Sequence, residues 1–202
     1  SFIQNPTARR NRRVVSNMKH IFLDRDGVIN EDHHLLHRKE DVKLLPQTTQ
    51  AIKLLNDHGF KVIIVTNQAV VARGLCTEED LKEIHEHLSL LFQKEGATID
   101  KIYSCPHHPT IGSNPHYTRD CNCRKPKPGM ILQAQKDFGI KDLSSCFMIG
   151  DRIRDIKCGE LAGCKTILVK TGDSGNNGEK DATPLYTAEN LYQAVQEIVL
   201  KK

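Results

Sequence analysis

The sequence predicts an α/β fold with three layers, in which helices cover both faces of a Rossmann-like parallel sheet. Short apolar runs recur along the chain and are rich in β-branched or bulky residues, as is typical of strands buried on both faces. Segments with helical patterns separate these runs, which favours right-handed crossovers between parallel strands. A chain of 202 residues is long enough for one well-buried domain of this kind.

Several of the predicted strands end in polar side chains. Asp24, Thr66 and Asp151 each fall at a strand end. Because ligands of open α/β sheets bind beyond the carboxyl ends of the strands, we expect these side chains to meet at one edge of the sheet. The predicted strands, of which the last is the weakest, are residues 20–24, 60–66, 146–151, 164–170 and 101–105.

The segments between the strands are predicted to be helices. Residues 46–58 begin with proline and are followed by Gly59, the usual start and stop signals. Thr77 is expected to cap the next helix, with Asp80 as its capping-box partner. Thr187 is expected to cap a last helix. The apolar stripes of these two helices are Leu81, Ile84, Leu88, Leu91 and Phe92, and Leu191, Ala194, Val195 and Ile198.

Three stretches match neither pattern. Residues 106–128 carry prolines, histidines and cysteines, and we expect an ordered loop held by something other than apolar burial. Residues 171–184 are rich in glycine, asparagine and aspartate, which predicts a mobile surface loop. Residues 1–18 contain an arginine cluster and are expected to be a flexible tail, leaving residues 19–202 as a single domain.

Composition narrows the class of protein. The net charge of +4 is too mild for a strongly basic nucleic-acid arm, and no apolar run is long enough to span a membrane. Seven cysteines, an odd number, fit poorly with a disulfide framework and indicate a reducing, cytoplasmic compartment. We expect a monomer that binds neither nucleic acid nor membrane. The cysteines expected in the core are Cys76, Cys146, Cys158 and Cys164.

A pair of carboxylates follows the first predicted strand. Asp24 and Asp26 lie two residues apart in the sequence Asp-Arg-Asp-Gly, so both can face one pocket. One carboxylate could attack a phosphorus atom while the other donates a proton to the leaving oxygen. Because a carboxylate repels a phosphate dianion, this chemistry requires basic side chains and a divalent cation, for which hard oxygen ligands select magnesium.

Later segments supply the remaining parts. The Thr-Asn-Gln sequence at residues 66–68 offers a hydroxyl and amides to hold phosphoryl oxygens, and Lys125 can neutralise the nucleophile. Asp151 and Asp155 offer further acidic groups for the metal. The motifs LDRDG, VTNQ, CRKPKPG and IGDRIRDI, in this order, resemble those of the haloacid dehalogenase superfamily of phosphohydrolases.

That resemblance implies a role for each motif. Asp24 would be the nucleophile and a magnesium ligand, and Asp26 the general acid and base, whose backbone carbonyl also binds the metal. Thr66 and Lys125 would bind the phosphoryl group. Asp151 would complete the magnesium site, and the acid four residues later would orient it. The gaps between the motifs are short, which predicts a minimal cap and an open pocket.

Cysteines and histidines crowd into the loop before Lys125. Three thiols and one imidazole would make a closed, tetrahedral and therefore structural zinc site. The imidazoles of His107, His108 and His116 are all within reach, and spacing alone does not choose among them. The zinc loop, residues 105–123, would hold two cations at the phosphate pocket. The candidate thiols are Cys105, Cys121 and Cys123.

The segments CPHHP and CNCRKPKPGM resemble the zinc loop of bacterial D-glycero-D-manno-heptose 1,7-bisphosphate phosphatases and their histidinol-phosphatase relatives, which implies that His107 is the fourth ligand. DRDGVIN and the VTNQ segment resemble the heptose enzymes more. The implied reaction removes the C7 phosphate, in nucleotide-activated heptose biosynthesis for lipopolysaccharide. The expected substrate contacts are Arg25, Asp32, His33, His34, Leu35, Asn67, Gln68, Ala69, Arg73, Arg124 and Arg152.

One cation favours a substrate with two phosphates. Arg124 can grip a second anion bidentately, unless it pairs with a local carboxylate such as Asp120. The chain also departs from the heptose enzymes at two expected contacts. Residues 32–35 read Asp-His-His-Leu where those enzymes usually carry Asp-His-Gly-aromatic, and residues 69–70 read Ala-Val where they tend to carry Ser-Gly.

Two other functions stay open. One is a phosphatase acting on histidinol phosphate or on another small sugar phosphate or bisphosphate. The second is a non-catalytic, zinc-bearing binding protein on the same fold. Loss of the nucleophile or the acid would favour a binding protein, but both carboxylates are present.

Overall fold

Six parallel strands form one sheet in the computed structural model, which describes residues 18–176 and 178–202. The predicted tail therefore lies outside the described residues, apart from Met18. The strands are β1 (Lys19–Leu23), β2 (Phe60–Asn67), β3 (Lys101–Cys105), β4 (Phe147–Gly150), β5 (Lys165–Val169) and β6 (Tyr186–Ala188). Their order in the sheet is β3-β2-β1-β4-β5-β6, and every neighbouring pair is parallel. The five predicted strands are confirmed.

Helices alternate with these strands along the chain. The α-helices are α1 (Thr48–Asp57), α2 (Glu78–Lys94), α3 (Gly129–Phe138), α4 (Ile153–Ala162) and α5 (Leu191–Gln193). The last one continues into a π-helical turn, η3 (Ala194–Ile198), and a 3-10 turn, η4 (Val199–Lys201), while the other 3-10 turns are η1 (Lys39–Asp41) and η2 (Leu143–Ser145). The capping box predicted for α2 is present, because Thr77 Oγ1 accepts from the backbone N–H of Asp80 (3.1 Å) and the Asp80 carboxylate accepts from that of Thr77 (2.8 Å).

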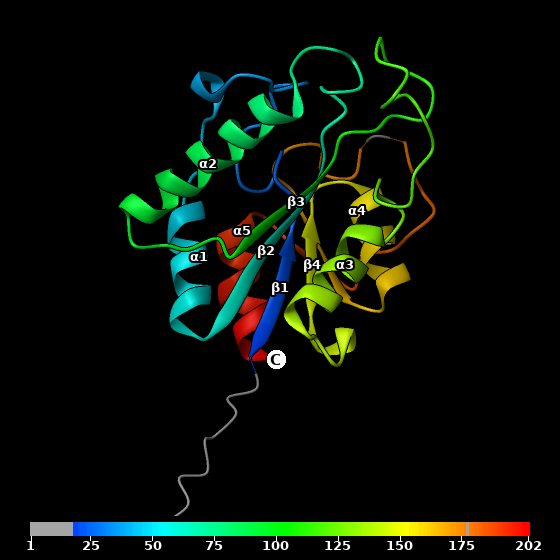
Figure 1. Cartoon of the computed structure of the whole chain (residues 1–202). Helices are drawn as coiled ribbons and strands as arrows, with labels where there is room; N and C mark the ends of the chain where they lie inside the picture. The colour runs from blue at the N-terminus through cyan, green and yellow to red at the C-terminus, as the bar shows by residue number, and fades with distance from the viewer. Residues whose placement is uncertain (1–17, 177) are drawn as a thin grey trace, which may run out of the picture.

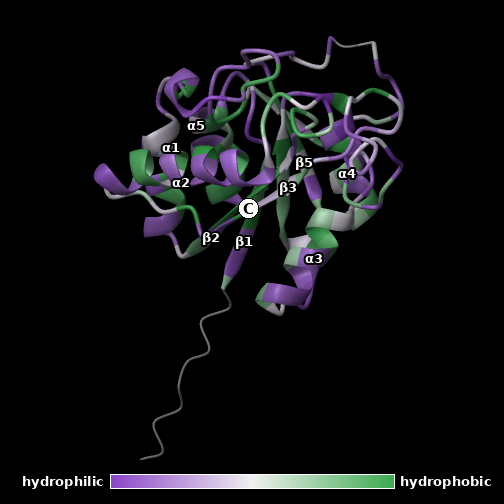
Figure 2. Ribbon diagram, turned by 45° about the horizontal axis from the view of Figure 1, so that its top comes forward, coloured by the Kyte–Doolittle hydropathy of each residue, from purple (hydrophilic) through white to green (hydrophobic). Residues whose placement is uncertain are grey.

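The helices form two layers, one on each face of the sheet (Figure 1). Successive residues of β1 point to opposite faces, so Ile21 and Leu23 pack with α1, α2 and α5, whereas Phe22 packs with α3 and α4. Figure 2 shows the resulting pattern, with hydrophobic strands inside and hydrophilic residues on the outer faces of the helices. The predicted three-layer architecture is therefore confirmed.

The chain reverses its direction of travel across the sheet at β1. It runs from β1 outward to β2 and β3, then returns to β4 on the other side of β1. A crevice is expected beyond the carboxyl ends of two such neighbouring strands, and ligands of α/β folds bind there. Asp24 follows β1 and Asp151 follows β4, so the topology alone brings these two predicted residues together.

The prediction for the carboxyl-terminal helix is wrong at its start. Thr187 lies in β6, where it pairs with Leu168 of β5, and the helix begins after Asn190, whose side chain accepts from the backbone N–H of Gln193 (2.9 Å). A three-residue edge strand carries too few residues to show a periodic pattern. Among residues 18–176 and 178–202, no helix is long and apolar enough to cross a membrane.

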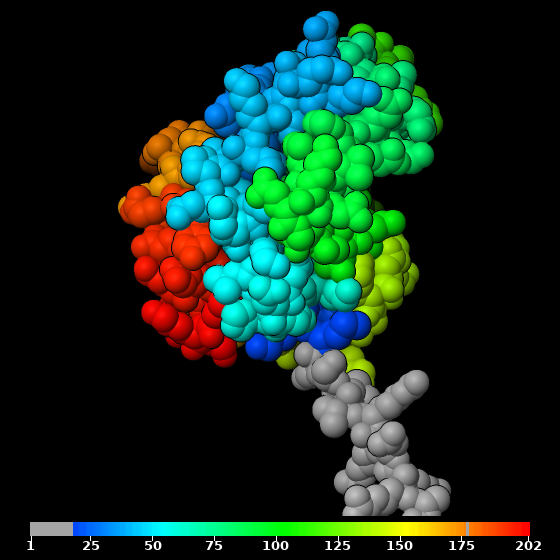
Figure 3. Space-filling model, turned by 90° about the vertical axis from the view of Figure 1, so that its left-hand side faces the viewer, coloured from blue at the N-terminus to red at the C-terminus, as the bar shows by residue number. Residues whose placement is uncertain are grey.

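Loops gather at the carboxyl ends of the strands. In Figure 3 the segment that follows β1, drawn in blue, lies at the top of the molecule above α1 and α2. The segment from β3 to α3 rises at the same end of the sheet (Figure 1). No large domain covers this end in the part of the chain that the structure describes.

Candidate active site

Lys125 lies between two of the predicted acidic residues. Its Nζ atom is 2.8 Å from Asp24 Oδ1 and 2.7 Å from Asp155 Oδ1, and it also donates to the carbonyl oxygen of Val65 (2.8 Å). Burial opposes the charge on Lys125, but the carboxylates of Asp155 and Asp24 raise its pKa. The lysine is therefore an ammonium ion that links the carboxyl ends of β1 and β2 to the start of α4.

Three buried carboxylates share this one ammonium group. Oxygen atoms of Asp24, Asp151 and Asp155 all lie within 4.8 Å of one another. Burial and the charge of Asp155 raise the pKa of Asp24 to about 7, against the effect of Lys125. Burial and the charges of Asp24 and Asp155 raise the pKa of Asp151 to about 8.

The cluster fits a divalent cation. When all three carboxylates are ionised, the one ammonium leaves two negative charges uncompensated. Asp151, which is 0% exposed, also has a buried Oδ1 without a hydrogen-bond partner among the described residues. Magnesium takes oxygen ligands and offsets such charge, so this donor set matches the predicted magnesium site. Asp155 also accepts from the backbone N–H of Arg152 (3.1 Å), which holds it at the first turn of α4.

Two glycines and a loop enclose Asp151. A Cβ atom at Gly27 or at Gly172 would lie 2.3 Å from Asp151 Oδ2, and both residues have a positive φ. The backbone N–H of Asp173 donates to the same oxygen (2.7 Å). Residues 171–184, which are predicted to form a mobile surface loop, therefore begin with residues that contact Asp151. Sequence reasoning missed this contact because it joins residues 22 positions apart.

Asp26 has a different environment, rich in donors. Arg25 Nε and Nη2 donate to its oxygens at 2.9 to 3.0 Å, Asn30 Nδ2 at 2.9 Å and Gln68 Nε2 at 2.8 Å. Burial disfavours the charged form, but these partners lower the pKa of Asp26 below its ordinary value. Asp24 and Asp26 thus differ in proton affinity although they are two residues apart. The order is opposite to that of an ionised nucleophile and a protonated acid, so catalysis requires bound charges that change both pKa values.

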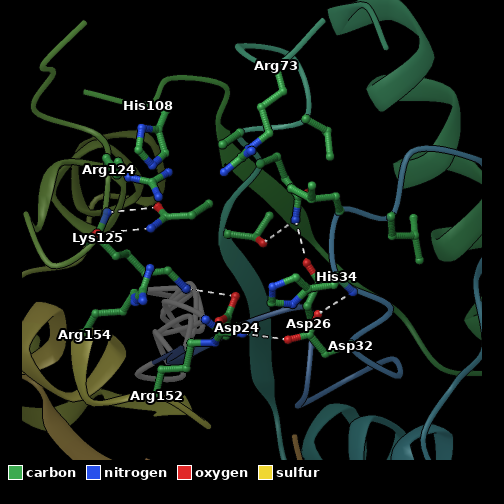
Figure 4. Close-up of a pocket in the computed structure, with 17 residues that line it drawn as sticks. Asp24, Asp26, Asp32, His34, Arg73, His108, Arg124, Lys125, Arg152 and Arg154 are labelled. Atoms are coloured by element: carbon green, nitrogen blue, oxygen red, sulfur yellow. Dashed lines mark hydrogen bonds and ion pairs between the residues drawn. The ribbon is translucent and has the colours of Figure 1, made fainter. Parts of the chain in front are cut away.

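Both carboxylates open into a pocket of about 260 Å³ (Figure 4). Most of the predicted catalytic and substrate residues line it, and Leu36, Val70, His108 and Arg154 line it in addition. The lining residues are Asp24, Asp26, Asp32, His34, Leu35, Leu36, Thr66, Asn67, Gln68, Ala69, Val70, Arg73, His108, Arg124, Lys125, Arg152 and Arg154.

One end of the pocket is strongly cationic. Arg73, Arg124 and Arg154 lie close enough for burial and the other two guanidinium groups to lower the pKa of Arg124. The Nε atoms of Arg73 and Arg154 are buried and have no hydrogen-bond partner within residues 18–176 and 178–202. Figure 4 shows Arg73, His108 and Arg124 on the side of the pocket away from Asp24. The pocket can therefore hold a second anion.

Residues 32–35, which are predicted to contact the substrate, include strained backbone conformations. Asp32 pairs with Arg152 Nη2 (2.7 Å), and the two residues between positions 33 and 36 have positive φ values, 42° at His34 and 72° at Leu35. The heptose enzymes usually carry glycine where His34 stands, and glycine adopts this conformation without strain. The loop therefore keeps a glycine-like backbone although the glycine is absent.

Two predicted substrate residues lie outside the pocket lining. Arg25 is 1% exposed and its guanidinium contacts Asp26, while His33 is exposed and its Nε2 lies 3.0 Å from Glu31. Asn67 lines the pocket and also fixes the catalytic loop, because its side chain donates to the carbonyl of Lys125 (3.0 Å) and accepts from its backbone N–H (2.9 Å). Arg25 therefore supports the site from behind, whereas His33 lies at the surface.

The Cys/His cluster lies beside the pocket. The sulfur atoms of Cys105, Cys121 and Cys123 are 3.0 to 3.5 Å apart, and His107 Nδ1 is 3.7 Å from Cys105 Sγ and 3.5 Å from Cys123 Sγ. A tetrahedral zinc ion with Zn–S bonds of about 2.3 Å would hold its sulfurs about 3.8 Å apart, somewhat farther than they are here. The four side chains converge closely enough to hold such an ion. His108 instead accepts backbone hydrogen bonds through Nδ1, which leaves His107 as the imidazole at the cluster.

The cluster is followed directly by two of the cationic residues that line the pocket, Arg124 and Lys125. Arg124 Nη1 donates to the carbonyl oxygen of His107 (3.0 Å), so its guanidinium is tied to the loop. Asp120, the alternative partner considered for Arg124, pairs with Lys127 Nζ at 2.7 Å. Arg124 therefore stays directed to the pocket. The other cysteines expected in the core are buried except Cys76, which is partly exposed.

Similar proteins agree with this geometry. A family model described as HAD-hydrolase-like matches residues 122–194. The D-glycero-beta-D-manno-heptose-1,7-bisphosphate 7-phosphatase of Photorhabdus laumondii subsp. laumondii is 39% identical over 166 residues, which cover 82% of this chain and 87% of that protein. The D-glycero-alpha-D-manno-heptose-1,7-bisphosphate 7-phosphatase of the same organism is 41% identical over 180 residues, covering 87% and 97%.

A solved structure is similar over the same extent. The crystal structure of D,D-heptose 1,7-bisphosphate phosphatase from B. bronchiseptica, complexed with magnesium and phosphate, has a TM-score of 0.79 and 32% identity, and it covers 92% of this chain and 100% of that one. The sequence relatives match nearly their whole length at about two residues in five. The chain therefore belongs to the D-glycero-D-manno-heptose-1,7-bisphosphate 7-phosphatase family of the HAD superfamily.

Proposed function

We propose that this chain is a phosphatase that removes the C7 phosphate of D-glycero-D-manno-heptose 1,7-bisphosphate and leaves heptose 1-phosphate. The observation that carries the proposal is the polarity of the pocket, which has a nucleophile at one end and the guanidinium groups of Arg73 and Arg124 at the other. A bisphosphate can place one phosphate at each end. The family relationship supports the same substrate.

The reaction would begin at Asp24. One of its carboxylate oxygens attacks the phosphorus atom, the bond from phosphorus to the C7 oxygen breaks, and the leaving oxygen takes a proton from Asp26. The pKa of Asp26 is low in the free protein. An approaching phosphate dianion favours the protonated form of this carboxyl, so substrate binding itself would load the acid.

The second half of the reaction would reuse the same groups. Asp26 accepts a proton from a water molecule, whose oxygen attacks the phosphorus atom bound to Asp24. The bond from phosphorus to the Asp24 oxygen then breaks, and inorganic phosphate leaves. Lys125 faces Asp24 at 2.8 Å and offsets its charge throughout. Thr66 lines the pocket beside it and would hold a phosphoryl oxygen.

The protein has residues to hold both expected metals. Asp24, Asp151 and the backbone carbonyl of Asp26 would hold magnesium, which would supply positive charge to the phosphoryl oxygens. Cys105, His107, Cys121 and Cys123 would hold zinc in a closed and therefore structural site. Their position directly before Arg124 and Lys125 would make order in this loop a condition for an ordered pocket.

The test is a comparison of phosphate release from several esters in the presence of magnesium. Purified protein is assayed with both anomers of the heptose bisphosphate, with a heptose 7-phosphate and with histidinol phosphate. We expect kcat/KM to be higher for a heptose bisphosphate than for histidinol phosphate by at least about tenfold, or about 1.4 kcal/mol. A preference of that size for histidinol phosphate would contradict the proposal.

A variant at the cationic end tests whether this end binds the phosphate that is not removed. Arg73→Met removes a guanidinium whose Nε has no partner in the described structure, so it should lower kcat/KM for the bisphosphate about tenfold, the usual effect of losing one charge-assisted hydrogen bond. The 7-phosphate should be hydrolysed as before. Arg38→Met, at an exposed position outside the pocket, is the matched control.

A further inference from the structure

One histidine of α2 contacts the catalytic motif from behind. His85 Nε2 lies 3.1 Å from Nη1 of Arg25, although the two residues are 60 positions apart. Arg25 is 1% exposed, so water does not readily replace a lost partner. The family motifs do not include α2, and the reaction described above makes no use of His85.

Arg25 is committed to Asp26 on its other nitrogens. Nε donates to Asp26 Oδ1 (3.0 Å), while Nη2 donates to Oδ1 (2.9 Å) and Oδ2 (3.0 Å). This bidentate pair fixes the plane of the Asp26 carboxylate. His85 supplies the acceptor for the remaining terminal nitrogen and thereby fixes the guanidinium itself.

His85 is suited to this task because it is neutral. Burial and the nearby charge of Arg25 lower the pKa of His85 to about 3, against the attraction of Asp26. A neutral imidazole that accepts through Nε2 carries its proton on Nδ1. Arg25, Asn30 and Gln68 donate hydrogen bonds to Asp26, and His85 contacts this network through Arg25.

We infer that His85 is a positioning residue for the general acid, acting through Arg25 on the orientation of Asp26. The inference rests on the acid role given to Asp26 in the proposed function. Without an acceptor at position 85, a buried guanidinium nitrogen would be left unpaired, and the side chain would turn to find another partner. The Asp26 carboxylate would then lose its fixed direction toward the leaving oxygen.

The surroundings of His85 allow a chemical rescue. The residue lines a groove of about 640 Å³ between α2 and β3, together with Ser104 and Pro106. The groove is open, so a small molecule can enter the space that a truncated side chain leaves. Added imidazole should therefore restore the acceptor in His85→Ala.

The decisive experiment compares two leaving groups. A sugar phosphate needs a proton on its departing alkoxide, whereas p-nitrophenolate leaves without one. The quantity to measure is kcat/KM, which covers the steps through phosphoryl transfer to the enzyme. His85→Leu should lower kcat/KM for the sugar phosphate about tenfold, part of the range of general acid catalysis, and that for p-nitrophenyl phosphate less than about twofold.

Three further variants complete the design. His85→Gln keeps a neutral acceptor and should recover most of the activity with the sugar phosphate. His85→Ala should recover activity when imidazole is added. His87→Leu, two residues along the same helix, should behave like the unaltered protein with both esters. Thermal unfolding of each variant with magnesium reports whether it is folded.

The outcomes separate this inference from the proposed function. An unaltered protein that hydrolyses neither ester would contradict the proposed function, and the role of His85 with it. Turnover by the unaltered protein with an equal loss of both activities in His85→Leu would show a general structural role and would overturn the inference alone. Undiminished activity in His85→Leu would overturn it as well.

Discussion

Lys125 decides whether three buried carboxylates can lie together. Its ammonium group is within 2.8 Å of two of them; Asp151 and Asp155 are fully buried, and Asp24 is 7% exposed at the pocket. A buried charge network of this kind contributes little to net stability but becomes strongly unfavourable when one partner is removed. We therefore propose that Lys125 combines a role in phosphoryl binding with a role in holding the site together.

Replacing Lys125 by methionine should affect both roles. We expect kcat to fall by at least about a hundredfold, because an electrostatic contact to the transferring group is lost. In magnesium-free buffer the free energy of unfolding should fall by about 3 kcal/mol, as for other broken buried pairs. Steady-state kinetics and chemical denaturation measure the two effects.

Lys127→Met is the matched control, two residues along the same segment. Its ammonium pairs with Asp120 at 2.7 Å, but both side chains are exposed. An exposed pair of this kind contributes at most about 1 kcal/mol. Activity near that of the unaltered protein is expected. A Lys125→Met protein as active as the Lys127→Met protein would contradict the role given to Lys125.

At the scale of elements, the loop proposed to bind zinc directly precedes two cationic residues of the pocket. Residues 105–123 contain little regular structure, yet they end directly before Arg124 and Lys125. Metal binding supplies folding free energy to such segments. Zinc bound here would therefore help to place Arg124 and Lys125 at the pocket.

Cys121→Ser should remove zinc and loosen this loop. Elemental analysis after exhaustive dialysis should find about one zinc ion per unaltered chain and much less in the variant. Activity should fall about tenfold or more, as when metal ligation is disturbed. Cys76→Ser, at a cysteine that is not part of the cluster, should keep its zinc. A zinc-free unaltered protein would contradict the assignment of the loop.

The segment after β5 also contacts the active site, through its backbone at Gly172 and Asp173. Gly172→Ala should weaken magnesium binding, because its Cβ would lie 2.3 Å from Asp151 Oδ2 and 2.7 Å from the Cα atom of Gly27. Gly163→Ala is the control. Gly163 also has a positive φ but faces open space. Its substitution therefore shows the effect of backbone strain without a contact to Asp151.

Magnesium titrations followed by activity measure the difference between these variants. The apparent Kd for magnesium should rise several-fold in Gly172→Ala and stay unchanged in Gly163→Ala. Equal affinities in the two variants would mean that the loop does not shape the metal site.

The sequence predicts elements where local pattern decides and fails where distant contacts decide. The buried strands and the capping box at Thr77 follow from neighbouring residues, so they were predictable. The strand at Thr187 exists because β5 offers a free edge, which no local pattern reveals. Arg25 looks like a pocket residue in sequence, but His85, 60 residues away, gives it a buried partner.

For the whole molecule, the cluster of carboxylates at Asp24, Asp151 and Asp155 makes the stability of the fold depend on pH. The pKa values of Asp24 and Asp151 are raised to about 7 and about 8, so the folded protein without metal binds more protons than the unfolded chain between about pH 4 and pH 8. The contribution of these groups to stability therefore falls as pH rises through this range. Magnesium would reverse the effect, because it binds the ionised carboxylates.

The rise in Tm on adding magnesium should therefore be larger at pH 8 than at pH 5.5. At a concentration of about 100 times Kd, magnesium should stabilise the fold by about 2.7 kcal/mol at the higher pH. The difference between the Tm values with and without magnesium is taken at each pH, which removes the contribution of other titrating groups, such as His85. Asp151→Asn should abolish the shift. An equal or larger shift at pH 5.5 would contradict the cluster as the magnesium site.

The central claim is that a phosphoryl group passes through Asp24. The most direct test is acid quenching during turnover with a bisphosphate radiolabelled at the C7 phosphate, followed by peptide mapping of the trapped label. We predict label on the peptide that contains Asp24, released by hydroxylamine, and no label and no turnover in Asp24→Asn. The opposite result is phosphate release by Asp24→Asn at the rate of the unaltered protein, or label trapped on a different residue.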